Sequence, residues 1–492
     1  MPTDDRPNIV LIQTDQLTPF VLGAYGDANA RTPNIDALAR SGVCFDGAYC
    51  NSPLCTPSRM SMLTGRYVQR LGTWDNGASL SSDVPTMLHT FSAAGYRTVL
   101  SGKMHFIGPD QLHGYEERLT TDIYPAYPKW TYDWDEEQRH GARHAPPGHD
   151  TWLWCHEYDQ RTVERALDWL RLNACDGLKG YRRKSNRPDK PFFLTVSMTN
   201  PHPPYCTPDA YWDRFEDVDL PLPTWPEGHI EQEHVEVRWN RDYHGLHELP
   251  TDDEVRAARR AYYGNVAFVD DKVGEIMHWI DELGLRENTI VVFCSDHGEM
   301  LGEHGCWCKR VAYEWSTRVP LIMSAPGRLP EGERVGEVTQ LVDLMPTLHE
   351  LCGLEPPQRV DGCSNVPLIE GRAVDWPNEA LCENYTEGLK AACCMLRRDH
   401  LKYVGVAGHE PALYDLNADP GEFTNVAGDP ACAEQEAAMK ARLAELWDAE
   451  GTDRAVREST ADRLIVKEAM EKGAHRPWDY DPAPDLRERW NR

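Results

Sequence analysis

Apolar runs rich in β-branched residues alternate with amphipathic stretches over the first three quarters of this 492-residue chain. This alternation is typical of parallel strands that are joined by crossover helices. It therefore predicts an α/β sandwich with a mostly parallel central sheet. Strands are predicted at residues 9–12, 96–100, 192–196, 289–293 and 320–323, and helices at residues 34–40, 86–94, 161–172, 254–283 and 344–351.

The pattern changes after residue 355, where short strands and turns replace the long alternation. We predict a large α/β domain over residues 1–355 and a small C-terminal α+β domain over residues 356–454, with a helix at 432–450. The extended tail, residues 455–492, begins as a helix and ends among prolines with Trp478 and Tyr480, so we expect it to dock on a neighbouring subunit. Residues 138–149 and 221–249 lack periodicity and are predicted to be long loops.

The charge balance limits the partners of the chain. Its 51 Lys and Arg against 79 Asp and Glu give a net charge of −28, which repels polyanions over most of the surface and argues against nucleic acid or an anionic membrane as the main partner. No apolar run is long enough for a membrane helix, and the N-terminus lacks the pattern of a secretion signal. We therefore expect a cytoplasmic protein, in which the 15 scattered cysteines are reduced and mostly buried.

The most informative segment is Cys55-Thr-Pro-Ser-Arg59, followed by Leu63-Thr-Gly-Arg66. Pro57 is placed to start a helix, so the Cys55 side chain lies at a helix N-terminus, where backbone N–H groups favour anions. Arg59 adds a fixed positive charge one turn into the helix. These features indicate a reactive thiol of low pKa, or a buried structural cysteine that precedes a capped helix.

This segment resembles the signature of the sulfatase family. The resemblance implies an alkaline-phosphatase-like fold and a Cys55 that a formylglycine-generating enzyme converts to formylglycine. The hydrated aldehyde of formylglycine carries two hydroxyl groups, so that one can take up the sulfuryl group and the other can expel sulfate.

Polar residues follow two of the predicted strands in the order that the family would place them. Asp15 and Gln16 follow the first strand, and Asp296 and His297 follow the strand at 289–293. Strand C-terminal ends gather ligands in open α/β sheets, and two carboxylates with an amide oxygen suit a hard cation. By resemblance, these four residues and Cys55 hold a divalent cation, Ca²⁺ first, with Mg²⁺ or Mn²⁺ as alternatives. The family usually has Asp-Asp and Asp-Asn at these pairs, which leaves His297 as a ligand or as a neighbour of the ligands.

Four basic residues also follow predicted strands or the second acidic pair: Lys103, His105, His202 and Lys309. Singly, each is more typical of a surface charge or a loop residue, but together they indicate an anion site in a strongly acidic chain. By resemblance, Arg59, Lys103 and Lys309 hold the sulfuryl oxygens. His202 or Lys309 protonates the leaving alcohol, and His105 acts as the base that releases sulfate.

Longer segments are similar to bacterial choline sulfatases, notably residues 101–126 and the tail at Pro477-Trp478-Asp479. The resemblance implies a homo-oligomer, a dimer or a tetramer, and a small sulfated substrate with a quaternary ammonium group that aromatic faces and carboxylates would hold. The residues expected to bind substrate are Trp74, Asp75, Asn76 and Trp130, with ordinary packing as the alternative.

Other functions stay open at this stage. Residues 138–149 and the segment Asn200-Pro-His-Pro-Pro-Tyr205 differ from the choline-sulfatase pattern, so an aryl, alkyl or carbohydrate sulfatase is an alternative. A phosphonate monoester or phosphodiester hydrolase would use the same nucleophile and cation on another ester. A binding protein without catalysis would keep the fold but leave Cys55 unmodified.

Overall fold

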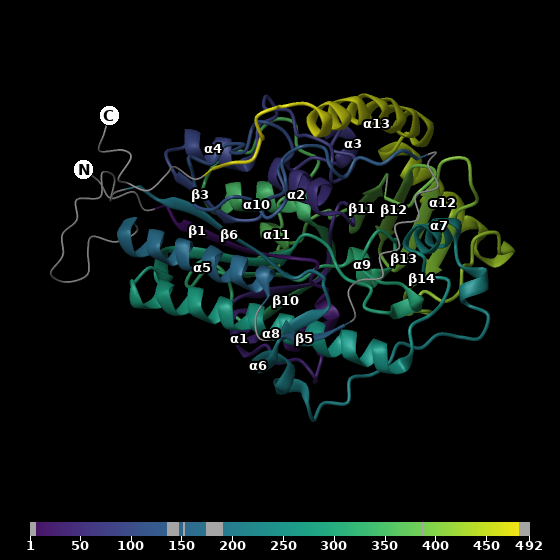
Figure 1. Ribbon diagram of the computed structural model, residues 1–492, viewed down its shortest axis with the longest axis horizontal. Helices are drawn as coiled ribbons and strands as arrows, with labels where there is room; N and C mark the ends of the chain where they lie inside the picture. Colours follow the sequence, from purple (N-terminus) through teal and green to yellow (C-terminus); the bar gives the residue numbers. More distant parts are fainter. Residues whose placement is uncertain (1–5, 135–146, 151–152, 174–189, 386, 482–492) are drawn as a thin grey trace.

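The computed structural model describes residues 6–134, 147–150, 153–173, 190–385 and 387–481 (Figure 1). Its centre is an eight-stranded sheet in the order β10-β2-β9-β8-β1-β6-β3-β4. The described pairs in this sheet are parallel except those of β9, which runs antiparallel to both β2 and β8. The strands span β1 (Asn8–Asp15), β2 (Val43–Tyr49), β3 (Arg97–Gly102), β4 (Glu117–Arg118), β6 (Phe192–Pro201), β8 (Thr289–Ser295), β9 (Leu321–Ser324) and β10 (Glu333–Gln340).

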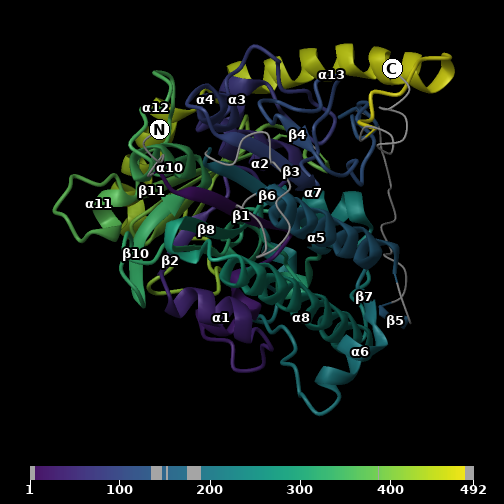
Figure 2. The same cartoon turned by 90° about the vertical axis from the view of Figure 1, so that its left-hand side faces the viewer.

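Helices cover both faces of the sheet, which explains why its inner strands are continuous apolar runs (Figures 1 and 2). In β1, Ile9 and Leu11 pack into the core on one face, and Val10 and Ile12 pack into the core on the other. The first face carries α2 (Cys55–Thr64), α4 (Met87–Ala93) and α10 (Leu344–Leu351), and the second carries α1 (Pro33–Arg40), α5 (Trp154–Asn173) and α8 (Asp252–Glu282).

A second, antiparallel sheet follows along the chain in the order β11-β12-β13-β14. Helix α12 (Ala433–Leu446) packs against it through Met439 and Leu443, and α13 (Ala449–Lys472) follows. The strands span β11 (Glu379–Asn384), β12 (Cys393–Arg398), β13 (Leu401–Val406) and β14 (Ala412–Asp415). The remaining short elements are α3 (Val68–Leu71), α6 (Asp209–Trp212), α7 (Val235–His244), α9 (Glu314–Thr317), α11 (Val366–Ile369), β5 (Gly148–Asp150) and β7 (Cys206–Pro208).

The predicted α/β architecture is confirmed, and each of the five predicted strands and five predicted helices overlaps an element of the same type. The prediction of a loop over 221–249 was wrong, because α7 lies inside it. That helix is short and polar, and it is stabilised by tertiary contacts such as the hydrogen bonds that Arg241 donates to the carbonyl oxygens of His304, at 2.8 Å, and Gly305, at 3.1 Å. Strands β2 and β10 were missed because Asp46, Gly47 and the charged residues of Glu333–Gln340 interrupt their apolar pattern.

The C-terminal segments differ in detail from the expected ones. The predicted helix at 432–450 is α12 followed by a separate helix, because Trp447 takes an extended backbone between them. Helix α13 runs without a break through the expected boundary at 454/455. The described part of the tail lies on its own chain, where Asp479 accepts a hydrogen bond from Ala126 N at 2.9 Å and Tyr480 packs against Arg118. The domain boundaries and the docking on another subunit stay predictions.

Residues 138–146 of the other predicted loop lie outside the described residues. Across the described part of the chain, no helix combines the length and the apolar character that crossing a membrane requires.

Asp270 of α8 caps helix α1 from a neighbouring element. Thr32, which precedes α1, makes no side-chain cap, and the Asp270 carboxylate instead accepts hydrogen bonds from Asn34 N at 3.0 Å and Ile35 N at 2.8 Å. The acceptor satisfies N–H groups that a helix start otherwise leaves unpaired.

We predict that Asp270→Ala lowers the free energy of unfolding by about 2 kcal/mol, because it removes this cap and leaves buried donors unpaired. Urea unfolding followed by circular dichroism measures the change. Asp281→Ala, at an exposed position near the end of the same helix, is the matched control and should change stability little. Equal effects of the two substitutions would contradict the capping role.

Candidate active site

The central strands deliver polar side chains to one edge of the sheet. Asp15 ends β1, Asp296 directly follows β8, and Lys103 directly follows β3. Gly102 makes the last position possible, because it has a φ of +105° and a Cβ there would lie 1.9 Å from the carbonyl oxygen of Ser197 in β6. The carboxyl edge of the sheet therefore carries the groups that the sequence predicted for a single site.

Cys55 begins helix α2 and is buried beside these groups. Its Sγ lies 3.0 Å from Lys309 Nζ, 3.4 Å from His297 Nε2 and 3.6 Å from Asp15 Oδ1. Burial raises the pKa of the Cys55 thiol, although the charge of Lys309 acts in the opposite direction. The structure therefore does not show an unmodified thiol of low pKa at this helix N-terminus.

Arg59 is fully buried, and its guanidinium connects several strands. Nε donates to Asp296 Oδ2 at 2.8 Å, and Nη1 donates to Ser197 Oγ at 2.9 Å and to the carbonyl oxygen of Lys103 at 3.0 Å. Nη2 has no hydrogen-bond partner among the described residues and lies 3.8 Å from Asp15 Oδ2. Nε and Nη1 thus have a structural role, and Nη2 is available to an anion.

Four side chains could hold a metal ion together. One ligand atom each from Asp15, Cys55, Asp296 and His297 lies within 4.8 Å of the other three. Gln16 follows Asp15: its backbone N donates to Asp296 Oδ1 at 3.0 Å, its side-chain Nε2 donates to Glu299 Oε2 at 2.5 Å, and its buried Oε1 has no hydrogen-bond partner among the described residues. Two carboxylates and an orphaned amide oxygen fit a hard divalent cation.

His297 is oriented as a metal ligand would be. Its Nδ1 lies 3.0 Å from the carbonyl oxygen of Gly298, which can only accept, so Nδ1 carries the proton. Burial lowers the pKa of His297 well below its usual value, so the ring is neutral and Nε2 has a free lone pair. Nε2 lies 3.5 Å from an oxygen of Asp15 and 3.5 Å from an oxygen of Asp296.

The site holds several charges away from water. Burial lowers the pKa of the Lys103 ammonium to about 7, although its Nζ contacts Asp15 Oδ2. Burial raises the pKa of Asp296, but the nearby positive charges, that of Arg59 first, together outweigh it and hold that pKa well below the usual range. Asp296 is therefore an anion at any physiological pH.

His105 and its loop are positioned by a buried carboxylate. Asp122 Oδ2 accepts from Met104 N and His105 N, both at 2.9 Å, and from Arg118 Nη2 at 2.8 Å. The ring nitrogens of His105 are buried and have no hydrogen-bond partner among the described residues, while the Tyr124 ring packs at 4.8 Å. Burial lowers the pKa of His105 well below its usual value, so it is a neutral base.

His202 follows β6 on a loop that α5 positions. Asp159 of α5 accepts from Thr199 N at 2.6 Å and from Asn200 N at 2.8 Å. His202 Nδ1 lies 2.7 Å from the carbonyl oxygen of Pro203, and burial lowers the pKa of the ring well below its usual value. His202 is therefore neutral, with its Nδ1 proton held by the backbone.

Cys55, His105, His202 and Lys309 line one cavity of about 240 Å³. Six of the predicted site residues line it: Cys55, Asn76, His105, Trp130, His202 and Lys309. The sequence did not reveal the other six: Tyr124, Tyr132, Tyr243, His244, Arg310 and Glu387. Arg310 could have been found as the neighbour of Lys309, but nothing in the sequence marks Glu387 or the tyrosines.

Two predicted substrate residues are not brought to this cavity. Trp74 is buried in the small core and packs edge-on against Tyr385 at 5.5 Å. Asp75 Oδ1 accepts from Arg463 Nη1 of α13 at 2.5 Å. Both residues attach α13 and the second sheet to the large sheet, which corrects the expectation that they face substrate.

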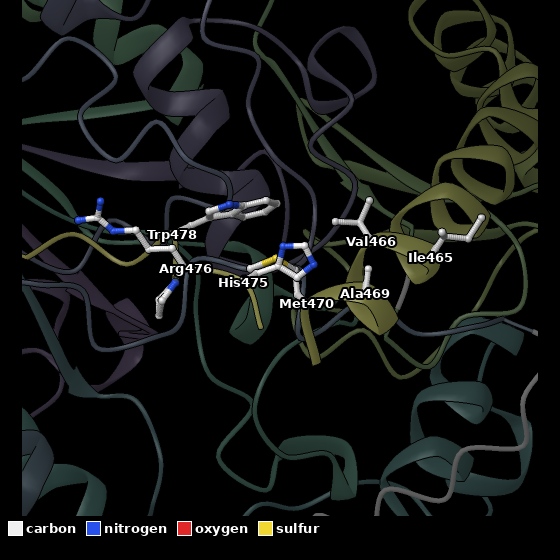
Figure 3. A pocket seen from close by; sticks show the side chains of 8 residues that line it. Ile465, Val466, Ala469, Met470, His475, Arg476 and Trp478 are labelled. Carbon is white, nitrogen blue, oxygen red and sulfur yellow. The ribbon is translucent and has the colours of Figure 1, made fainter. Parts of the chain in front are cut away.

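A larger cavity, of about 520 Å³, lies between α13 and the tail (Figure 3). Figure 3 shows Ile465, Val466, Met470 and Trp478 around it, and none of the nucleophilic or metal-binding side chains lines it. The smaller cavity at the sheet edge is therefore the candidate active site.

Comparisons with known proteins agree with this geometry. The sulfatase family profile matches residues 7–354, and a profile of the C-terminal region of N-sulphoglucosamine sulphohydrolase matches residues 302–449. The choline-sulfatase of Rhizobium meliloti (strain 1021) is 36% identical over 509 aligned residues, which cover 100% of this chain and 96% of the relative.

Two further relatives show the range of the similarity. An arylsulfatase of Clostridium perfringens (strain 13 / Type A) is 31% identical and aligns with 86% of this chain and 90% of its own. The crystal structure of the phosphonate monoester hydrolase of Agrobacterium radiobacter superposes with a TM-score of 0.72, at 26% identity, over 90% of this chain and 95% of the other. With a family profile that matches more than half of its length and sulfatases among its relatives, the chain belongs to the sulfatase family and is a sulfuric ester hydrolase.

Proposed function

We propose that this protein hydrolyses a sulfate monoester to an alcohol and inorganic sulfate through a formylglycine formed from Cys55, beside a divalent cation. The observation that carries the proposal is the position of Cys55. Its Sγ contacts Lys309 Nζ at 3.0 Å, it shares a possible metal site with Asp15, Asp296 and His297, and it faces the cavity that His105 and His202 also line.

The positive side chains suit the charge of the reacting group. The peripheral oxygens of a sulfuryl group stay anionic during transfer, so preorganised cations lower the barrier. Lys309 beside Cys55, Lys103 beside Asp15 and the Nη2 of Arg59, which has no hydrogen-bond partner among the described residues, are placed to hold these oxygens. Formylglycine would supply two hydroxyl groups on one carbon, one to receive the sulfuryl group and one to release it.

The two proton transfers divide between the basic residues. The neutral His105, whose buried ring nitrogens have no partner among the described residues, is placed to accept a proton when sulfate leaves. His202 is neutral and its Nδ1 proton is held by the Pro203 carbonyl. Of the two candidates for the acid, we therefore assign the proton for the leaving alcohol to Lys309, and His202 Nε2 would accept a hydrogen bond from the alcohol once that proton has been transferred.

Asp15, Gln16, Asp296 and His297 would hold the cation, Ca²⁺ first and Mg²⁺ or Mn²⁺ as alternatives. Such an ion would neutralise part of the sulfuryl charge. Gln16 and His297 are uncharged ligands, so the ion would meet two carboxylates rather than the three of the usual family pattern. This leaves more of its positive charge for the substrate.

The setting of the reaction completes the proposal. A formylglycine-generating enzyme would act on Cys55, the substrate would be a small sulfated organic molecule, and the location would be the cytoplasm. We also propose a homo-oligomer, a dimer or a tetramer, with α13 at the contact. The exposed side chains of Ile465 and Val466 beside the cavity in Figure 3 support that choice.

Besides the aryl sulfate of the Clostridium relative, the relatives offer two identities for the ester. Choline sulfate is a candidate because of the Rhizobium relative and because Trp130 and Tyr124 line the cavity. A phosphonate monoester is the second candidate, because of the Agrobacterium structure. Hydrolysis of either ester would use the same nucleophile and cation. The two candidates are therefore distinguished by measuring the rate of hydrolysis of each ester.

We predict that Cys55→Ala lowers sulfate release from 4-nitrophenyl sulfate by at least about a thousandfold, because it removes the nucleophile. Protein produced together with a formylglycine-generating enzyme is assayed beside Cys352→Ala, a matched buried cysteine outside the cavity, which should keep its activity. Sulfate release by Cys55→Ala at the rate of the parent protein would refute the proposal. A faster rate on 4-nitrophenyl phenylphosphonate than on the sulfate would favour the phosphonate reaction.

We predict that a chelator lowers the activity at least about tenfold and that added Ca²⁺, Mg²⁺ or Mn²⁺ restores it. Gln16→Ala should raise the cation concentration needed for half-maximal activity by about tenfold or more, because it removes the orphaned amide oxygen. Gln435→Ala, at an exposed position in α12, is the control. Cation binding measured by calorimetry on the same proteins should show the same order, and full activity after exhaustive chelation would contradict the metal site.

A further inference from the structure

The outer wall of the active-site cavity contains a carboxylate, that of Glu387, and both of its oxygens already accept hydrogen bonds. Glu387 Oε1 accepts from Asn76 Nδ2 at 3.0 Å, and Glu387 Oε2 accepts from Arg310 Nε at 2.6 Å, while Arg310 Nη2 forms an ion pair with the same oxygen at 2.5 Å. The Glu387 side chain is only 4% exposed. A charge-assisted contact of this kind is stronger than a neutral hydrogen bond.

This pair is joined directly to the reaction centre. Arg310 is the next residue after Lys309, and Asn76 Oδ1 accepts from the backbone N of Thr56, which follows Cys55, at 3.0 Å. Arg310 and Glu387 have φ values of 81° and 54°, a region that residues with side chains seldom adopt. Such backbone is retained where the surrounding structure holds it, and it concentrates at ligand sites.

The charges of the wall disfavour a cationic alcohol. Among the described residues that line the cavity, Glu387 is the one carboxylate, and the guanidinium of Arg310 neutralises it. Lys309 adds a second positive charge. A quaternary ammonium group would find aromatic faces here but no unpaired carboxylate, and it would lie near the like charge of Lys309.

The same wall suits an uncharged group that has hydroxyls. Arg310 directs its Nε hydrogen bond and its Nη2 ion pair to one oxygen of Glu387, and its Nη1 has no partner among the described residues, so the two N–H groups of Nη1 can donate to ligand oxygens. The rings of Trp130, Tyr132 and Tyr243 also line the cavity, with Tyr132 and Tyr243 edge to face at 6.1 Å, and they offer apolar faces to C–H groups. The volume of about 240 Å³ is below the 300 to 1,000 Å³ of sites for drug-sized ligands, which limits the alcohol to about one ring.

We infer that Arg310 and Glu387 form a specificity-determining pair that binds an uncharged, hydroxylated alcohol, such as a single sugar residue, and excludes a quaternary ammonium group. This inference rests on the proposed sulfatase reaction. It names the alcohol part of the substrate, which the nucleophile and the cation do not select.

The test compares kcat/KM for glucose 6-sulfate and choline sulfate, with 4-nitrophenyl sulfate as the reference substrate for each protein. The parent protein should prefer glucose 6-sulfate by at least about tenfold, the effect of one charged hydrogen bond. Arg310→Met keeps the length of the side chain, removes the donors and leaves Glu387 as an unpaired carboxylate. The ratio of the two rates should then shift toward choline sulfate by about a hundredfold.

Two further variants keep the result interpretable. Arg310→Met combined with Glu387→Gln removes both charges, so it should lose the preference for glucose 6-sulfate without a gain on choline sulfate, even if the single variant does not fold. Arg372→Met breaks an ion pair with Glu350 on the surface and should leave the ratio unchanged.

The outcomes separate the two claims. A parent protein that cleaves 4-nitrophenyl sulfate but prefers choline sulfate to glucose 6-sulfate, or an Arg310→Met variant with the parent's ratio, overturns the assignment of the pair and leaves the sulfatase reaction standing. A converted parent protein that cleaves none of the three sulfates overturns both.

Discussion

The buried guanidinium of Arg59 is the interaction on which the site depends. A charge without solvent is stable only when it is paired and hydrogen-bonded, and Arg59 meets that condition through Asp296, Ser197 and the backbone of Lys103. These partners come from the ends of β8, β6 and β3. One side chain of α2 therefore fixes the relative positions of three strand ends and, with them, the distances between the nucleophile position, the possible metal ligands and the cations around them.

The site has an inner and an outer part with different physical demands. The inner part concentrates charges of both signs, and its residues are held by short contacts to backbone and to one another. In the outer part, at Asn76, Arg310 and Glu387, both carboxylate oxygens are hydrogen-bonded while Arg310 Nη1 has no partner among the described residues, so this part can change the fit of the alcohol. This division explains how one fold can serve relatives that are named for choline, aryl and phosphonate esters.

The sequence predicted the features that depend on short stretches of the chain, namely the central strands and the polar residues that follow them. The apolar runs indicated the central strands, and the residues that follow them, such as Asp15, Lys103 and Asp296, lie at the sheet edge because parallel strands end together. Strands β2 and β10 and helix α7 were not predicted, since tertiary pairing stabilises them against their own polar composition. Trp74 and Asp75 were assigned to substrate because their composition fits a cation cage, but a sequence does not reveal which way a side chain faces.

The role of formylglycine at position 55 is tested most directly by relating the rate of sulfate release to the chemical state of that residue. Preparations made with graded amounts of a formylglycine-generating enzyme are digested, the fraction of the Cys55 peptide that carries the aldehyde is measured by mass spectrometry, and sulfate release from 4-nitrophenyl sulfate is measured on the same samples. We expect the rate of sulfate release to be proportional to the aldehyde fraction and to extrapolate to zero for the unmodified thiol. Equal rates in preparations with and without the aldehyde would contradict it.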